Sequence, residues 1–164
     1  MISAQQIGKN IYNKAVSHLG EKEIPAGSNN GPQVNRYLAF CGLDPGNPWC
    51  ACFASFVTYY TLLQMGLSSL PCLKTASSHE AVNWGMEHKT IQTRDSCVTG
   101  DWLIERGGNG DPADDGFSYH HTVILDYVDA NGTCFWVGGN TSNSVAAGTC
   151  NIDDCCILRP YVVF

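Results

Sequence analysis

The sequence lacks long apolar runs, basic stretches and charge of one sign gathered in one segment. Charged residues make up only 15% of the 164-residue chain, and the formal net charge is -6. Without a basic stripe, nucleic acid and anionic membrane surfaces are not expected as partners. The longest apolar segment, CACFASFVTYYTLLQMG at residues 50–66, is too short and too rich in hydroxyl groups to span a bilayer. Membrane insertion is therefore not expected.

Cysteine pairs with the spacing of zinc-ribbon or thioredoxin-type sites are also missing, although the chain contains nine cysteines. No two of them form a Cys-x-x-Cys motif, so a zinc ribbon or a thioredoxin-type redox motif is unsupported. An odd total leaves at least one thiol free if the others form disulfides. Eight bonded cysteines beside one free nucleophile and nine buried reduced thiols are both compatible with the sequence.

The patterns that are present indicate one domain of the α+β class, covering residues 1–164. Apolar residues recur at helical spacing in the first half. The expected helices run from about Ser3 to Gly20, Pro32 to Gly42, Trp49 to Met65 and Ser77 to Lys89. The second half predicts strands at WLIER, HTVILDYV, TCFWVGG and ILRPYVVF, with DANG as a hairpin turn. Helices followed by an antiparallel sheet define the α+β class.

Two cysteines, Cys50 and Cys52, lie in GNPWCACFASFV, where a loop becomes a predicted helix. In the first helical turn, backbone N–H groups lack partners and the helix dipole is positive, which favours a thiolate. The same N–H groups can stabilise the oxyanion of an acyl intermediate. The helical period turns Cys52 about 200° away from Cys50, so the two thiols cannot share one base. The alternative is that both are core or disulfide cysteines.

A cysteine nucleophile needs a general base, usually a histidine that a third group orients. His120 and His121 open a predicted strand, and neighbouring strand residues point to opposite faces, so one of the two is expected to face the helices. Asn140 ends the partner strand of the DANG hairpin, which places it across from His121. An asparagine there can hold one imidazole tautomer. Asp126 is a competing candidate further along the strand.

Together these segments resemble a CHAP domain, the cysteine- and histidine-dependent amidohydrolase/peptidase branch of the papain-like, NlpC-like superfamily. The resemblance is carried by GSNNGPQVNRYL, NPWCACFASFV, TGDWLI, HHTVILDYV and VGGNTS, which follow the family's order. It implies a papain-like fold with helices packed on a central antiparallel sheet. It also implies Cys50 as the nucleophile, His121 as the base and Asn140 as the third member. Some members carry an acidic residue two positions before the asparagine, where this chain has Gly138.

The resemblance further implies a peptidoglycan hydrolase that needs no cofactor. Such domains cut the amide between N-acetylmuramic acid and L-alanine, or a peptide bond in the stem or cross-bridge. Only Asp44 stands where calcium-binding members carry an acidic loop, so no metal is expected. Trp49, Trp84, Tyr119 and Trp136 are candidates for contacting the saccharide or peptide, with core packing as the alternative.

The first twenty residues lack the basic start and apolar segment of a secretory signal. The expected setting is a phage lysin, or an effector delivered into rival bacteria. Such a monomer would be made in the cytoplasm and act on peptidoglycan at the wall, with an immunity protein as a further partner. Two alternatives stand beside the hydrolase: a non-catalytic module that binds muropeptides or a partner, and a protein deamidase or transglutaminase-like enzyme.

Overall fold

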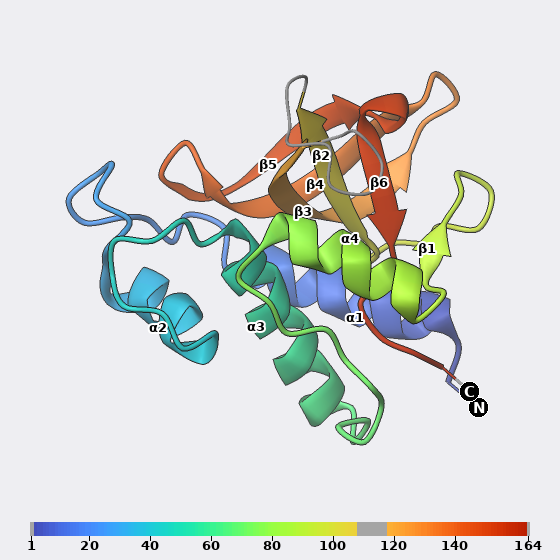
Figure 1. Cartoon of the computed structure of the whole chain (residues 1–164), viewed down its shortest axis with the longest axis horizontal. Coiled ribbons are helices and arrows are strands. Elements are labelled where there is room, and N and C mark those ends of the chain that lie inside the picture. Colours follow the sequence, from blue (N-terminus) through green and yellow to red (C-terminus); the bar gives the residue numbers. More distant parts are fainter. Residues whose placement is uncertain (1, 108–117, 164) are drawn as a thin grey trace.

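The computed structural model describes residues 2–107 and 118–163, and it confirms the α+β class (Figure 1). The helices are α1 (Ala4–Ser17), α2 (Pro32–Phe40), α3 (Cys50–Gln64) and α4 (Ser78–Glu87). The strands are β1 (Ile91–Gln92), β2 (Trp102–Gly107), β3 (Ser118–Val128), β4 (Thr133–Thr141), β5 (Ser144–Asn151) and β6 (Cys155–Leu158). A short 3-10 turn, Ile152–Asp154, connects β5 to β6.

The six strands form one antiparallel sheet in the order β1-β6-β2-β3-β4-β5. The predicted hairpin at DANG is confirmed, with Val128 paired to Cys134. The predicted last strand is wrong in its bounds: β6 begins at Cys155 and ends at Leu158. Pro160 lies two residues beyond that end, and proline cannot donate a hydrogen bond to a strand ladder.

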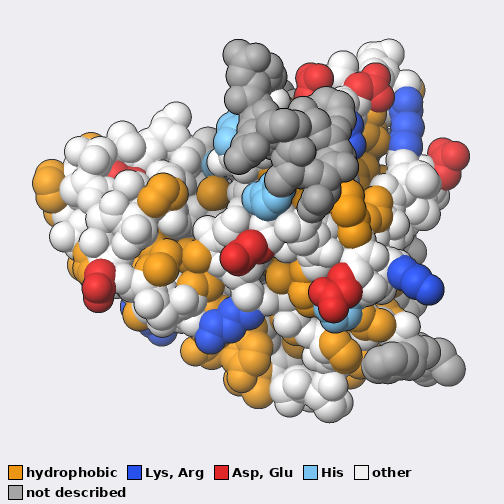
Figure 2. Space-filling view, viewed as in Figure 1, with side chains coloured by type: hydrophobic (Ala, Val, Ile, Leu, Met, Phe, Trp, Pro, Cys, Tyr) orange, Lys and Arg blue, Asp and Glu red, His pale blue; other side chains and the backbone are white. Residues whose placement is uncertain are grey.

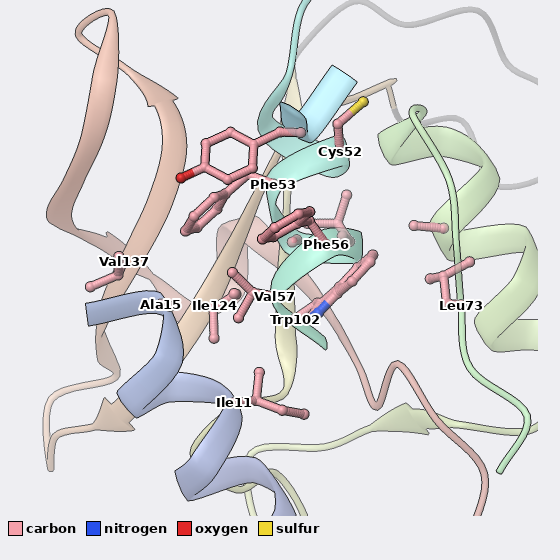
Figure 3. Packing of buried hydrophobic residues seen from close by; sticks show 14 of the residues in the cluster. Ile11, Ala15, Cys52, Phe53, Phe56, Val57, Leu73, Trp102, Ile124 and Val137 are labelled. Atoms are coloured by element: carbon pink, nitrogen blue, oxygen red, sulfur yellow. The ribbon is translucent and has the colours of Figure 1, made fainter. Parts of the chain in front are cut away.

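The sheet separates two clusters of buried side chains. The larger cluster lies between the sheet and the helices, with α3 at its centre (Figure 3). The smaller cluster covers the other face of the sheet and consists of Leu103, Val123, Leu125, Cys134, Trp136, Cys155 and Ile157. Residues that alternate along β3 therefore divide between the two clusters, with Ile124 in the larger and Val123 in the smaller. The alternation holds from His121 to Leu125, whereas Tyr119, beyond an irregularity in the β2–β3 pairing, belongs to the larger cluster.

Helix α3 is buried on nearly all sides, because α1, α2 and the sheet surround it (Figure 1). Its side chains Cys52, Phe53, Ala54 and Val57 have no exposed surface. A helix in this position has little freedom to move. The residues at its first turn are therefore held in place by the core of the protein.

A buried ion pair joins the turn before β2 to the segment after β6. Asp101 is fully buried, and its two carboxylate oxygens accept from Nε and Nη2 of Arg159, each at 3.0 Å. The backbone N–H of Val98 donates to the same carboxylate at 2.9 Å. Beyond Arg159, the hydroxyl of Tyr161 donates to the carbonyl of Ala4 at 3.0 Å. These contacts hold the two ends of the described chain side by side (Figure 1).

Within the described ranges, no helix is both long enough and apolar enough to cross a membrane.

Candidate active site

Cys50 is the first residue of α3, and Trp49 is the residue that caps the helix. No side chain accepts a hydrogen bond from the first turn of α3, and the first backbone bond runs from Phe53 N to Trp49 O at 2.9 Å. The N–H groups before Phe53 have no acceptor within the helix. Cys50 is 8% exposed, so the residue lies just below the surface at this end of the helix.

Trp49 is fully buried and therefore offers no surface to a substrate. Its ring stacks on Tyr37 at 5.7 Å, and its Nε1–H donates to Oε1 of Glu23 at 2.9 Å. Glu23 is itself 3% exposed, and its other oxygen accepts from the backbone N–H of Asn29 at 3.1 Å. The structure thus gives Trp49 a packing role next to Cys50, in place of the substrate contact suggested by the sequence.

Replacing Glu23 with alanine is expected to lower the free energy of unfolding by about 2 kcal/mol, because two buried donors lose a charged acceptor. Urea denaturation of Glu23→Ala beside Glu21→Ala provides the measurement, since Glu21 is exposed in the same segment. Equal stability of the two variants would show that the carboxylate does not hold Trp49 and the loop at Asn29.

The end of β4 packs directly against the start of α3. A side chain at Gly139 would place its Cβ 2.6 Å from Cβ of Phe53 and 2.8 Å from the ring of Trp49. Only glycine lets the backbone approach this closely. Asn140 follows with a left-handed φ of 53°, inside an irregularity of the β4–β5 pairing between Gly138 and Thr141. Asparagine tolerates this conformation better than most residues.

His121 lies near the beginning of β3 and is half-buried. Its Nε2 is 3.3 Å from the hydroxyl oxygen of Thr141, the residue after Asn140. Its ring meets Trp136 edge-on at 6.0 Å. Burial, with a smaller effect from the charge of His120, lowers the pKa of His121 below its ordinary 6.5.

The alternation along β3 places His121 on the face opposite the helices. Thr122 faces the helices, because its hydroxyl lies 2.7 Å from that of Ser78 at the start of α4. His121 shares the other face with Val123 and is paired across the ladder with Glu105 of β2. Burial raises the pKa of Glu105, and the charge of His120 opposes that rise. Glu105 is thus an acid beside the imidazole that sequence reasoning missed, because nothing in WLIER marks it.

The structure brings the segment before Asn140 against the segment before Cys50, whereas His121 lies on the other face of the sheet. Gly139 packs on Trp49, so the residues before Cys50 and before Asn140 meet. Among the described atoms, no hydrogen bond joins Cys50 to His121 or to Asn140. Within the same ranges, no three His, Cys, Asp or Glu side chains are placed to hold a metal ion.

A second histidine, His79, lies in the first turn of α4. The segment before α4 is bonded to α3, because the hydroxyl of Ser55 donates to the Thr75 carbonyl at 2.9 Å and accepts from the Thr75 N–H at 3.0 Å. His79 is half-buried, and its ring is 6.1 Å from that of Tyr119. Figure 2 shows histidine side chains on the face where α4 begins. Nothing in the sequence favours a catalytic role for this residue over a surface one.

The other aromatic candidates are also largely enclosed. Tyr119 is 9% exposed and belongs to the larger cluster, whereas Trp136 is 6% exposed and belongs to the smaller one. Trp84 is half-buried and stacks on His88 at 4.2 Å. These rings mainly pack the protein, so little of their surface is available to a substrate.

Comparison with known proteins gives no match to any protein-family model, curated protein or solved structure. The CHAP resemblance is therefore carried by the sequence motifs alone.

Proposed function

We propose that the protein is a thiol-dependent hydrolase of peptidoglycan amide bonds with a papain-like fold. The observation that carries the proposal is the position of Cys50 at the uncapped start of a buried helix, against the Gly139–Thr141 end of β4. Helix-start N–H groups favour a thiolate and can bind an oxyanion. His121 and Asn140 lie at the same end of the β3–β4 hairpin, linked through Thr141.

In this mechanism the Cys50 sulfur attacks the carbonyl carbon of the substrate amide, and His121 takes the thiol proton. N–H groups at the start of α3 stabilise the oxyanion. His121 returns the proton to the leaving amine, which leaves a thioester on Cys50. Water then attacks the thioester, with the imidazole as base, and releases the acid product.

Because His121 points to the sheet face opposite the helices, the proposal requires its imidazole to reach the Cys50 thiol past the end of the sheet when substrate is bound. Catalytic hydrogen bonds are often long or absent in unliganded enzymes and tighten in the complex. The contact from His121 to Thr141 is long at 3.3 Å, so little energy is lost when it breaks. His79 is the competing base. A His121→Ala variant with no cleavage, beside active His79→Ala and His120→Ala variants, identifies His121 as the base.

The direct test is mass spectrometry of bacterial sacculi incubated with the protein. New amino groups on muropeptides, at one defined amide, are the expected result. Sacculi that bind the protein but yield only intact muropeptides would favour a non-catalytic binding module. Ammonia released from a protein glutamine, without any change in the sacculi, would favour a deamidase. The delivery route and an immunity partner belong to the same proposal and need assays in living cells.

Cleavage is expected to persist as the pH falls through 6.5, because burial keeps the His121 imidazole neutral below that value. The acid limb of kcat/KM on a soluble muropeptide should lie below pH 6.5. His120→Gln should move this limb upward, since it removes a charge that lowers the His121 pKa. The lowered pKa of His121 also means that acid destabilises the folded protein. Below about pH 6.5 the imidazole is protonated in the unfolded chain before it is protonated in the folded protein, so the free energy of unfolding falls. An acid limb above 6.5 that His120→Gln leaves unchanged would contradict His121 as the base.

A further inference from the structure

Four cysteines gather on the face of the sheet opposite the helices, away from Cys50. Cys134 and Cys155 belong to the smaller cluster, and Cys97 and Cys150 pack against it. The thiols of Cys97, Cys134, Cys150 and Cys155 form no disulfide in this structure. The sulfurs of Cys150 and Cys155 are 3.2 Å apart, and Cys134 is directly opposite Cys150 in the β4–β5 ladder. These thiols take no part in the proposed hydrolysis.

The contact between Cys150 and Cys155 joins strands that are separated by β2, β3 and β4 in the sheet. The sheet curls so far that the end of β5 meets the start of β6 (Figure 1). The intervening 3-10 turn is fixed: Asn151 caps it by accepting from Asp153 N at 3.0 Å, and Ile152 N donates to Gly132 O at 2.9 Å. The two thiols are therefore held close by a structured turn.

We propose that Cys150 and Cys155 are a redox-active dithiol that a small-molecule disulfide oxidises to an intramolecular disulfide. A disulfide needs its sulfurs about 2.05 Å apart, so the thiols have to approach by roughly 1 Å. A structured turn that already holds two thiols in contact favours this bond over bonds to more distant cysteines.

The two thiols have different roles. Cys150 is half-exposed, whereas Cys155 is 5% exposed. The sulfurs of Cys150 and Cys155 are in hydrogen-bond contact at 3.2 Å, and either thiol can donate, so the thiolate of one is stabilised by the thiol of the other. The reactive form in thiol–disulfide exchange is the thiolate. Because Cys150 is the more exposed of the two, an oxidant in solution reaches it first, so Cys150 is the attacking residue and Cys155 the resolving residue.

The reaction balances with glutathione disulfide as the oxidant. The Cys150 thiolate attacks one glutathione sulfur, the disulfide of the oxidant breaks, and one glutathione leaves and takes up a proton. The Cys155 sulfur then attacks the Cys150 sulfur of the mixed disulfide. The second glutathione leaves with the Cys155 proton. Two protein thiols are oxidised, and one glutathione disulfide is reduced to two thiols.

The test is to incubate the whole protein with glutathione disulfide, block free thiols by alkylation, and digest with a protease that cleaves before aspartate. Cleavage at Asp153 and Asp154 separates Cys150 from Cys155, so their peptides stay linked only through a disulfide. The expected result is this linked pair in the wild type and in Cys134→Ser and Cys156→Ser. Both cysteines alkylated in folded wild-type protein, or a link that Cys134→Ser or Cys156→Ser abolishes, would overturn the proposal.

The order of the two steps is tested by trapping. Cys155→Ser should carry glutathione on Cys150, and Cys150→Ser should carry at least tenfold less on Cys155. A faster adduct on Cys155 would overturn the assigned roles. Because the linked peptides are read in the wild type, a variant that fails to fold does not remove the test.

Discussion

Cys50→Ala is expected to abolish muropeptide release, whereas Cys52→Ala is expected to keep it. Cys50 is the proposed nucleophile at the start of α3, and losing a nucleophile typically lowers kcat by on the order of 10⁴-fold or more. Cys52 is fully buried on another side of the same helix. Its loss removes one buried sulfur and is expected to cost about 1 kcal/mol of stability. Release of muropeptides from sacculi, with urea denaturation of both variants, gives the two readouts.

The pair of variants controls for structural damage. Both substitutions remove one sulfur from the first turn of α3, so a general loss of packing would affect them alike. Equal loss of cleavage in the two variants would indicate damage to the helix. Full activity in Cys50→Ala would exclude Cys50 as the nucleophile.

Asp101→Asn is expected to lower the free energy of unfolding by about 3 kcal/mol. The substitution preserves shape but removes the charge that Arg159 faces. Removing one member of a buried ion pair leaves the other charge uncompensated, which typically costs about 3–5 kcal/mol. We expect a loss of stability at the lower end of this range, because the Arg159 side chain is 16% exposed and water can partly solvate its charge, whereas the Asp101 side chain is fully buried. Urea denaturation measures the loss.

Asp95→Asn is the matched control, since Asp95 is exposed in the turn before β2. It should change stability by less than about 0.5 kcal/mol. The double variant Asp101→Asn/Arg159→Leu should lose less than the sum of the two single variants, because no unpaired charge remains. Strict additivity would show that the two side chains do not stabilise one another.

The helices could be predicted because the capping residues and the spacing of apolar residues indicate the same helix bounds. Ser3 accepts from the Gln6 N–H, and Ser77 accepts from the Glu80 N–H, at the expected starts of α1 and α4. Strand β5 was missed because its sequence, SVAAGTCN, is rich in alanine, glycine and serine, which are not typical of strands. Its pairing comes from tertiary structure, where Gly148 makes room for the ring of Trp136.

The candidate site was predictable only in part. The start of α3 at Cys50 follows from local signals, since a proline and a tryptophan precede an apolar helix. The face of His121 depends on the alternation along β3 and on the irregularity near Asn140, which no local pattern encodes. The burial of Trp49 depends on Glu23, which lies far away in the chain. Long-range contacts therefore decide which neighbours can reach the thiol.

The hydrogen bond from Tyr161 to Ala4 has a consequence for engineering. The two ends of the described chain lie side by side, away from the start of α3 (Figure 1). A short linker could join the ends, and new ends could be opened in the exposed turn after α3, near Ser68 and Ser69. Such a circularly permuted chain would keep the same sheet and the same surroundings of Cys50.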